Sequence, residues 1–94
     1  MNSININKVL NLSNITIVDV RSYNDYLEGH IPGAIFMDYY KLLFNPEKYL
    51  NKDKSYYFYC FSGSRSLQLV DRLNRMGYHC INILGGYQKY LLSK

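Results

Sequence analysis

Short apolar runs and amphipathic segments alternate along the chain. Four runs rich in β-branched or aromatic residues predict strands at positions 15–18, 34–37, 55–59 and 80–84. After these runs, apolar residues recur at helical spacing and predict helices at positions 23–27, 39–43, 66–76 and 87–92. Strands that alternate with helices are typical of a parallel sheet with helices on both faces. The pattern therefore predicts an α/β fold.

Two residues have the types that commonly begin or end a helix. Near the start of the chain, Ser3 is a suitable N-cap for a short helix, whose apolar side would carry Ile6, Val9, Leu10 and Leu12. Gly77 follows the 66–76 segment at the position where glycine commonly ends a helix. Because of Ser3 and the apolar residues that follow it, we expect one more helix before the first predicted strand.

Length and composition are those of one small domain, which we expect to span residues 1–94. Hydrophobic residues make up 48% of the chain, enough for a core without metal or disulfide support. The formal net charge is +4, but the Lys and Arg residues are scattered and form no dense basic block. We expect a surface that favours small anions and does not bind nucleic acid.

The cysteine count and the N-terminus indicate the compartment. Cys60 and Cys80 are the only two cysteines, and neither has a second Cys or a His at metal-ligand spacing. We therefore expect no metal and no cofactor. The N-terminal segment has neither the basic region nor the apolar core of a signal peptide, and no apolar run is long enough to span a membrane. These features predict a cytoplasmic protein that does not bind membranes.

The stretch YFYCFSGSRS places a cysteine directly after a predicted strand and before a predicted helix. In open parallel sheets this position faces the ligand-binding crevice. The loop that follows Cys60 consists of Phe61, Ser62, Gly63, Ser64 and Arg65, and its small residues allow successive N–H groups to point inward. Together with the positive end of the next helix and the Arg65 guanidinium, these groups would stabilise a thiolate. Cys60 is therefore a candidate nucleophile, and residues 61–65 are candidate substrate-binding residues.

Two chemistries remain open for such a thiolate: attack on a sulfane sulfur and attack on a phosphoryl group. Phosphatases that use a Cys–Arg pair have a longer loop, which fits a tetrahedral phosphate with its oxygens. Only four residues lie between Cys60 and Arg65 here. A shorter ring of N–H groups suits one sulfur atom added to the cysteine. The loop length favours sulfur transfer over a phosphatase or arsenate reductase.

Four motifs together resemble single-domain rhodaneses: Asp19-Val20-Arg21, GHIPGA at 29–34, YCxSGxRS at 59–66 and Leu84-x-Gly86. The resemblance covers residues 15–90 and implies a rhodanese-like fold, a five-stranded parallel sheet with helices on both faces. It also implies a sulfurtransferase that moves a sulfane sulfur from thiosulfate or a persulfide donor, through a Cys60 persulfide, to cyanide or a thiol. A non-enzymatic alternative is a sulfur-relay module that exchanges sulfur with a protein donor or acceptor.

The remaining motif residues are expected to be structural and to lie near the site: Asp19, Arg21, His30, Gly85 and Gly86. Arg21 stands four positions before Asp25 and would pair with it across a helical turn. His30 is a weak candidate for a general base, because a thiolate stabilised by dipoles needs none. Cys80 is interpreted as a structural residue rather than a resolving thiol. Phe61 is expected to line the mouth of the site and to favour a larger or less charged donor, or a protein surface.

Overall fold

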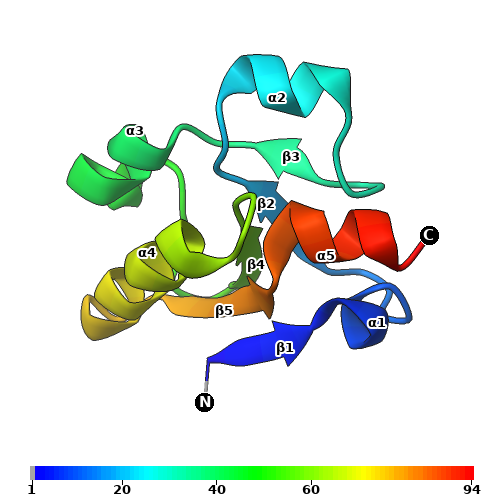
Figure 1. The fold of residues 1–94 in the computed structure, drawn as a ribbon. Helices are drawn as coiled ribbons and strands as arrows, with labels where there is room; N and C mark the ends of the chain where they lie inside the picture. The colour runs from blue at the N-terminus through cyan, green and yellow to red at the C-terminus, as the bar shows by residue number, and fades with distance from the viewer. Residues whose placement is uncertain (1) are drawn as a thin grey trace.

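The computed structural model describes residues 2–94 and contains a five-stranded sheet in the order β1-β5-β4-β2-β3 (Figure 1). All neighbouring strands pair in parallel. The strands are β1 (Ser3–Asn5), β2 (Thr16–Asp19), β3 (Ile35–Phe36), β4 (Ser55–Tyr59) and β5 (His79–Leu84). The helices are α1 (Ile6–Val9), α2 (Tyr23–Glu28), α3 (Tyr39–Phe44), α4 (Ser64–Arg75) and α5 (Gly86–Leu92), with a 3₁₀ turn η1 (Pro46–Lys48).

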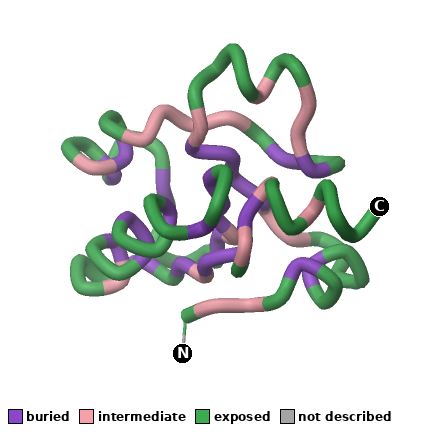
Figure 2. The backbone as a smooth tube through the Cα atoms, viewed as in Figure 1, coloured by how far each residue is buried: buried purple, intermediate pink, exposed green. Residues whose placement is uncertain are grey.

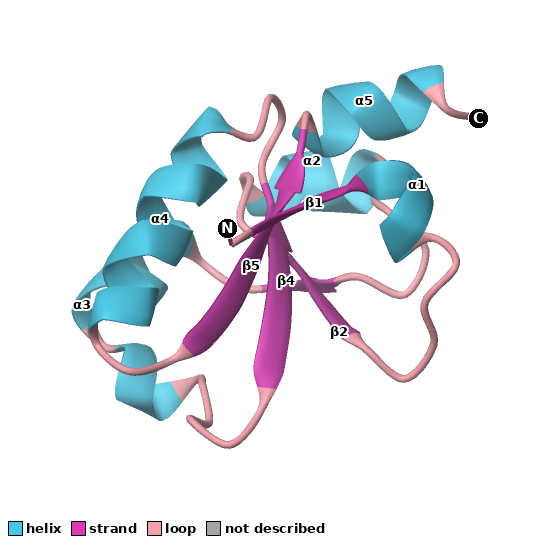
Figure 3. Ribbon diagram, turned by 90° about the horizontal axis from the view of Figure 1, so that it is seen from below, coloured by secondary structure: helices cyan, strands magenta, loops and turns pink. Residues whose placement is uncertain are grey.

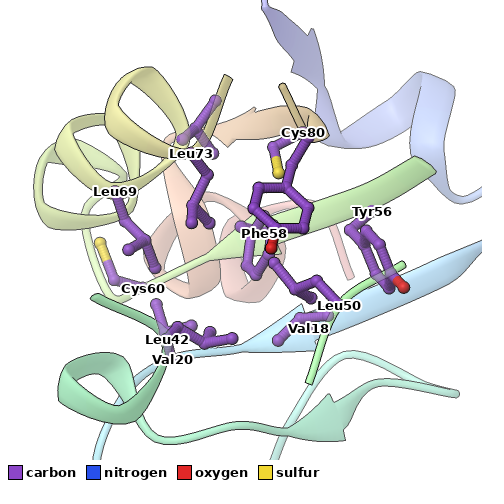
Figure 4. Packing of buried hydrophobic residues seen from close by; sticks show 12 residues of the cluster. Val18, Val20, Leu42, Leu50, Tyr56, Phe58, Cys60, Leu69, Leu73 and Cys80 are labelled. Atoms are coloured by element: carbon purple, nitrogen blue, oxygen red, sulfur yellow. The ribbon is translucent and has the colours of Figure 1, made fainter. Parts of the chain in front are cut away.

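Helices cover both faces of the sheet, as predicted (Figure 3). The alternation of side chains along β4 divides the core between these faces. Tyr56, Phe58 and the adjoining Cys60 pack on the side of α3 and α4 (Figure 4). Tyr57 and Tyr59 point to the opposite side, which α1 and α5 cover. The site cysteine is therefore a continuation of the core layer beneath α4.

Burial is concentrated in the central strands and in the inner side of α4 (Figure 2). Along α4, the residues with no exposed surface recur at helical spacing: Ser66, Leu69, Val70 and Leu73. Three of these four side chains are apolar, and their removal from water stabilises the helix against β4 and β5. Ser66 is the polar exception, and it lies next to the candidate site.

The four strands expected from the sequence are confirmed, with shifts of only a few residues at their ends. The 66–76 helix is also confirmed, but α4 begins earlier, at Ser64. Gly63 precedes it with a φ of 98°, a conformation that other residues rarely adopt. Gly77 has a φ of 97° just after the helix, as its predicted role requires.

The expectation for the N-terminal segment was wrong. Ser3 does not cap a helix; it begins β1, which pairs with Asn82, Ile83 and Leu84 of β5. The short helix α1 starts later and is capped by Asn5, whose side chain accepts a hydrogen bond from the N–H of Asn7. Leu10 and Leu12 lie beyond this helix and are exposed. The segment therefore supplies the fifth strand of the sheet.

Within residues 2–94, no helix has the length and apolar character needed to cross a membrane.

Candidate functional site

The candidate site lies at the carboxyl edge of the sheet, where β4 leads through a short loop into α4. Because the strands are parallel, the loops that follow β3, β4 and β5 all lie at this edge. The loop after β4 consists of residues 60–63, and α4 then offers the free N–H groups of its first turn. Cys60 therefore lies at the N-terminal end of a 12-residue helix, where the helix dipole is positive.

The Cys60 sulfur lies beside α4 (Figure 4). It accepts hydrogen bonds from main-chain donors. The N–H of Gly63 donates to Sγ over 3.2 Å, and the N–H of Ser66 donates over 3.3 Å. Only 5% of the Cys60 surface is exposed, so water competes little for these donors. The loop therefore forms a cradle of N–H groups around a single sulfur atom.

The cradle makes the thiol more acidic than an ordinary cysteine. Burial raises the pKa of the Cys60 thiol, because the charged form loses its hydration. Hydrogen bonds from Ser66 and from the N–H groups of Gly63 and Arg65 lower the pKa, and together they outweigh burial. The net pKa lies below the usual value. A larger share of Cys60 is therefore thiolate at neutral pH.

The other side of the cradle is held by the start of α5. The N–H of Tyr87 donates to the carbonyl of Cys60, and the N–H of Gln88 donates to the carbonyl of Phe61, both over 2.9 Å. Gly86 makes this approach possible, since a Cβ there would collide with the same two carbonyls. Gly85, with a φ of 76°, supplies the turn into α5. Both glycines thus have the structural role expected of them.

Arg65 contributes to the site through two different groups. Its main-chain N–H faces the Cys60 sulfur. Its guanidinium lies against α3, 4.4 Å from the ring centre of Tyr39 and 5.2 Å from that of Tyr40. Nη2 of Arg65 also donates to the hydroxyl of Tyr40 over 2.7 Å. A cation and a phenol from two helices are therefore paired beside the cradle.

The outer rim of the cradle is open to solvent. Phe61 is 53% exposed, as its expected place at the mouth requires. Ser62 and Ser64 are also exposed, and their hydroxyls lie 3.0 Å apart. Three surface hollows of about 340–360 Å³ exist elsewhere, and none of them is lined by residues 60–65. The thiol thus lies beneath a solvent-exposed, partly apolar rim.

Asp19 and Arg21 form a buried ion pair below the site, with 2.7 Å between Oδ2 and Nη2. Arg21 therefore pairs with Asp19, and the expected pair with Asp25 was wrong. Tyr59 donates its hydroxyl proton to Asp19 over 2.7 Å, and Arg21 donates to the carbonyl of Gly29 over 2.6 Å. The cluster joins β2, β4 and the GHIPGA segment, which is the structural role expected of Asp19 and Arg21.

His30 and Cys80 both lie in structural settings. Nδ1 of His30 is 2.8 Å from the carbonyl of Tyr26, and its ring stacks on the Tyr26 ring with the centres 3.9 Å apart. Cys80 lies opposite Tyr56 in the sheet, four residues before Cys60 along β4. That offset is about 13 Å, at roughly 3.3 Å per residue. A disulfide requires Cα atoms within about 7 Å, so Cys80 cannot resolve a modified Cys60 without rearrangement of the sheet.

Two polar residues at the site were not singled out from the sequence, namely Ser66 and Asn82. Both are fully buried, and Ser66 Oγ donates to Asn82 Oδ1 over 2.6 Å. The available signal was a single asparagine inside the apolar run CINIL. Within residues 2–94, no three His, Cys, Asp or Glu side chains lie close enough together to hold a metal ion.

Comparison with protein families gives one match that spans nearly the whole chain. The family described as "Rhodanese-like domain" matches residues 5–93. The chain belongs to the rhodanese-like domain family. The match includes both the cradle loop and the Asp19–Arg21 cluster, so the resemblance inferred from the motifs is confirmed.

Several relatives of this rhodanese-like domain are named as sulfurtransferases. The putative sulfurtransferase YtwF of Bacillus subtilis is 38% identical over 74% of this chain and 67% of its own length. The thiosulfate sulfurtransferase GlpE of Coxiella burnetii is 31% identical over 81% of this chain and 71% of its own. A tRNA sulfurtransferase of Pyrobaculum aerophilum is 39% identical over 65% of this chain. That match spans only 12% of the larger protein.

A solved structure confirms the fold of this rhodanese-like domain. The crystal structure of a rhodanese-like domain protein from Staphylococcus aureus superposes with a TM-score of 0.80 at 32% identity. The superposition covers 96% of this chain and 91% of the other. The five-stranded parallel sheet is therefore the rhodanese-like fold.

The two cysteines of this rhodanese-like domain are expected to differ sharply in reactivity. At pH 7, iodoacetamide should alkylate Cys60 faster than Cys80, because the lowered pKa of Cys60 leaves a larger share of it as thiolate than in an ordinary cysteine. Cys80 should stay unmodified, because burial raises its pKa to about 12 and only 2% of it is exposed. Peptide mass spectrometry after timed quenching measures both rates. In denaturant the two rates should converge, and equal rates in the folded protein would contradict the cradle geometry.

Proposed function

We propose that this chain is a sulfurtransferase that carries sulfane sulfur as a persulfide on Cys60. The observation that carries the proposal is the set of N–H donors on the Cys60 sulfur, which contributes to lowering its pKa. Relatives named as thiosulfate sulfurtransferases support the same chemistry. Cys60 and Cys80 are both free thiols, and we place the protein in the reducing cytoplasm, where the thiol persists.

In the first half-reaction, the Cys60 thiolate attacks the outer, sulfane sulfur of thiosulfate. A new S–S bond forms to Cys60 as the bond between the two thiosulfate sulfurs breaks. The electron pair of that bond leaves with sulfite. The negative charge of the product lies on the terminal sulfur of the Cys60 persulfide, so no proton has to be moved by a side chain. The reaction therefore requires no general base, and His30, which contacts the carbonyl of Tyr26, is not needed as one.

In the second half-reaction, a thiolate or cyanide attacks the terminal sulfur of the persulfide. The S–S bond breaks, its electron pair returns to Cys60, and the thiolate is restored for the next cycle. The same main-chain donors then serve twice, since the N–H groups of Gly63 and Ser66 stabilise the thiolate both as attacking group and as leaving group.

The rim residues are proposed to bind the rest of the donor. Arg65 is held against α3, where its Nη2 donates to the Tyr40 hydroxyl oxygen. The phenol oxygen accepts in that contact, so its own proton is available to an anion beside the guanidinium. The sulfonate of thiosulfate or a carboxylate on an organic persulfide would bind there, with Phe61, Ser62 and Ser64 around it.

The test is to incubate the protein with thiosulfate, or with an organic persulfide, and to measure the mass of the Cys60 peptide. The proposal expects an added mass of one sulfur that disappears on treatment with cyanide, with thiocyanate as the product. Turnover of p-nitrophenyl phosphate, tested in parallel, is expected to be absent. No adduct from any sulfane donor together with phosphatase turnover would replace this proposal with a phosphatase.

A second candidate is a sulfur-relay module that exchanges sulfur with another protein. The exposed rim favours it, because Phe61, Ser62 and Ser64 are open to contact with another protein. The match to a short part of a tRNA sulfurtransferase also supports it. Rapid transfer of sulfur from a persulfide-bearing protein together with slow turnover of thiosulfate would favour the relay. Comparable rates with both donors would favour the small-molecule enzyme.

Phe61 is expected to set the preference between donors. Phe61→Lys should raise the rate with thiosulfate relative to that with an apolar organic persulfide, by roughly threefold to tenfold, because a cation replaces an apolar ring at the rim. Steady-state kinetics with both donors at low salt measures the ratio. Leu92→Lys makes the same change in charge on an exposed residue outside the cradle and should leave the ratio unaltered. An unchanged ratio in Phe61→Lys would contradict this role.

A further inference from the structure

Asn82 is a polar side chain inside the apolar layer between β5 and α4. It is 1% exposed, and apart from Ser66 the buried residues of that layer are apolar or cysteines. A buried amide is costly unless each of its polar atoms has a partner. Across residues 2–94, every buried side-chain nitrogen and oxygen that the structure describes has such a partner. The hydrogen-bond partners of Asn82 therefore indicate its role at this position.

Both ends of the Asn82 amide contact the residues that donate to the Cys60 sulfur. Nδ2 donates to the carbonyl of Gly63 over 3.0 Å, and Oδ1 accepts from Ser66 Oγ over 2.6 Å. A main-chain carbonyl can only accept, so this contact settles which end of the amide is the nitrogen. Gly63 and Ser66 are also the residues whose N–H groups lie 3.2 Å and 3.3 Å from Sγ.

We propose that Asn82 is a positioning residue, which holds Gly63 and Ser66 so that their N–H groups point at the Cys60 sulfur. It does not touch the reacting atoms, and it acts from a neighbouring strand through the loop and the first turn of α4. The inference refines the proposed function, but it concerns the state of the thiol and can be tested without any sulfur donor.

The direction of the expected effect depends on the Ser66 hydroxyl, which has one proton. Its contacts are Asn82 Oδ1 at 2.6 Å, the Gly63 carbonyl at 3.2 Å and the Cys60 sulfur. The Ser66 hydroxyl also counts among the groups that lower the pKa of Cys60, but its single proton is directed at Asn82, because that distance is the shortest and Oδ1 is a strong acceptor. If Asn82 is removed, the Gly63 carbonyl loses its amide partner and takes the proton instead. The sulfur then gains no donor, while its two main-chain donors lose their support.

The test compares two asparagines that bridge the same helix to the same strand. Asn82→Leu removes the bridge at the cradle. Asn74→Leu removes the bridge at the far end, where the Asn74 side chain pairs with the N–H and the carbonyl of Cys80. In Asn82→Leu, the pH profile of Cys60 alkylation should move up by about one unit, which makes alkylation below the pKa about tenfold slower. In Asn74→Leu the profile should stay in place despite a similar loss of stability.

Each outcome decides the inference. An unchanged profile in a folded Asn82→Leu protein would overturn it, and so would an equal shift in Asn74→Leu. If Asn82→Leu does not fold, Asn82→Thr gives the same decision, because threonine suits a strand and its shorter side chain cannot bridge both partners. The alkylation profile could shift in Asn82→Leu while the unmodified protein forms no Cys60 persulfide. That result would support the positioning role and overturn the proposed function.

Discussion

Cys60→Ser is expected to abolish persulfide formation and to lower sulfur transfer by about a thousandfold or more. A serine hydroxyl stays protonated at neutral pH, and oxygen cannot form the S–S bond that carries the sulfur. The cradle itself should survive, because serine is smaller than cysteine and can still accept from the N–H groups of Gly63 and Ser66. Intact-mass measurement after incubation with thiosulfate, together with the rate of thiocyanate formation, checks both parts of this expectation.

Cys80→Ala is the matched control for the nucleophile. It removes the other buried thiol, which lies on the same face of the sheet but opposite Tyr56, far from the cradle. We expect the persulfide adduct and the rate of sulfur transfer to be retained, with a modest loss of stability from the small cavity. An adduct on Cys60→Ser, or its loss in Cys80→Ala, would show that the sulfur is carried elsewhere.

The largest effect on stability is expected from Asp19→Ala, at about 3–5 kcal/mol of the free energy of unfolding. The Asp19 side chain has no exposed surface, and that of Arg21 is 8% exposed. Loss of the carboxylate leaves a buried guanidinium without its counter-charge and the Tyr59 hydroxyl without its acceptor. A domain of this size has a total stability of roughly 5–15 kcal/mol, so the variant would lose much of it. Urea denaturation followed by circular dichroism measures the change.

Asp25→Ala is the control for this prediction, because it removes an exposed carboxylate near the same arginine. It should cost less than about 1 kcal/mol, as exposed charges usually do. If both variants lose similar stability, the Asp19–Arg21 pair is not the buried anchor that its geometry indicates.

The candidate site could be located from the sequence because its signals are local. Cys60, the small residues after it and the apolar spacing of the following helix lie within one continuous stretch, and main-chain geometry converts that order directly into a strand, a loop and a helix. The resemblance to rhodaneses added the five-stranded sheet, which the apolar runs alone did not predict in full. They predicted four strands, because β1 has only three residues and Ile4 is its single apolar one.

Contacts between distant segments could not be predicted from the local sequence pattern. Arg21 follows β2 and is held between Asp19, the buried last residue of that strand, and the carbonyl of Gly29, whereas the spacing to Asp25 predicted a helical pair that the chain does not form. The Arg65 guanidinium lies on Tyr39 and Tyr40, which are 25 and more positions away. Such pairings depend on the order of strands in the sheet, and many orders are compatible with one pattern of apolar residues.

The sequence by itself therefore determined the α/β class, the position of the candidate nucleophile and the loop that surrounds it. Only the tertiary structure decided which polar groups support that loop, since Asn82 reaches Gly63 and Ser66 from a strand 16 or more positions further along the chain. The physical reason is that apolar burial acts on local periodicity, while a buried hydrogen bond exists only after packing has brought its two partners within about 3 Å.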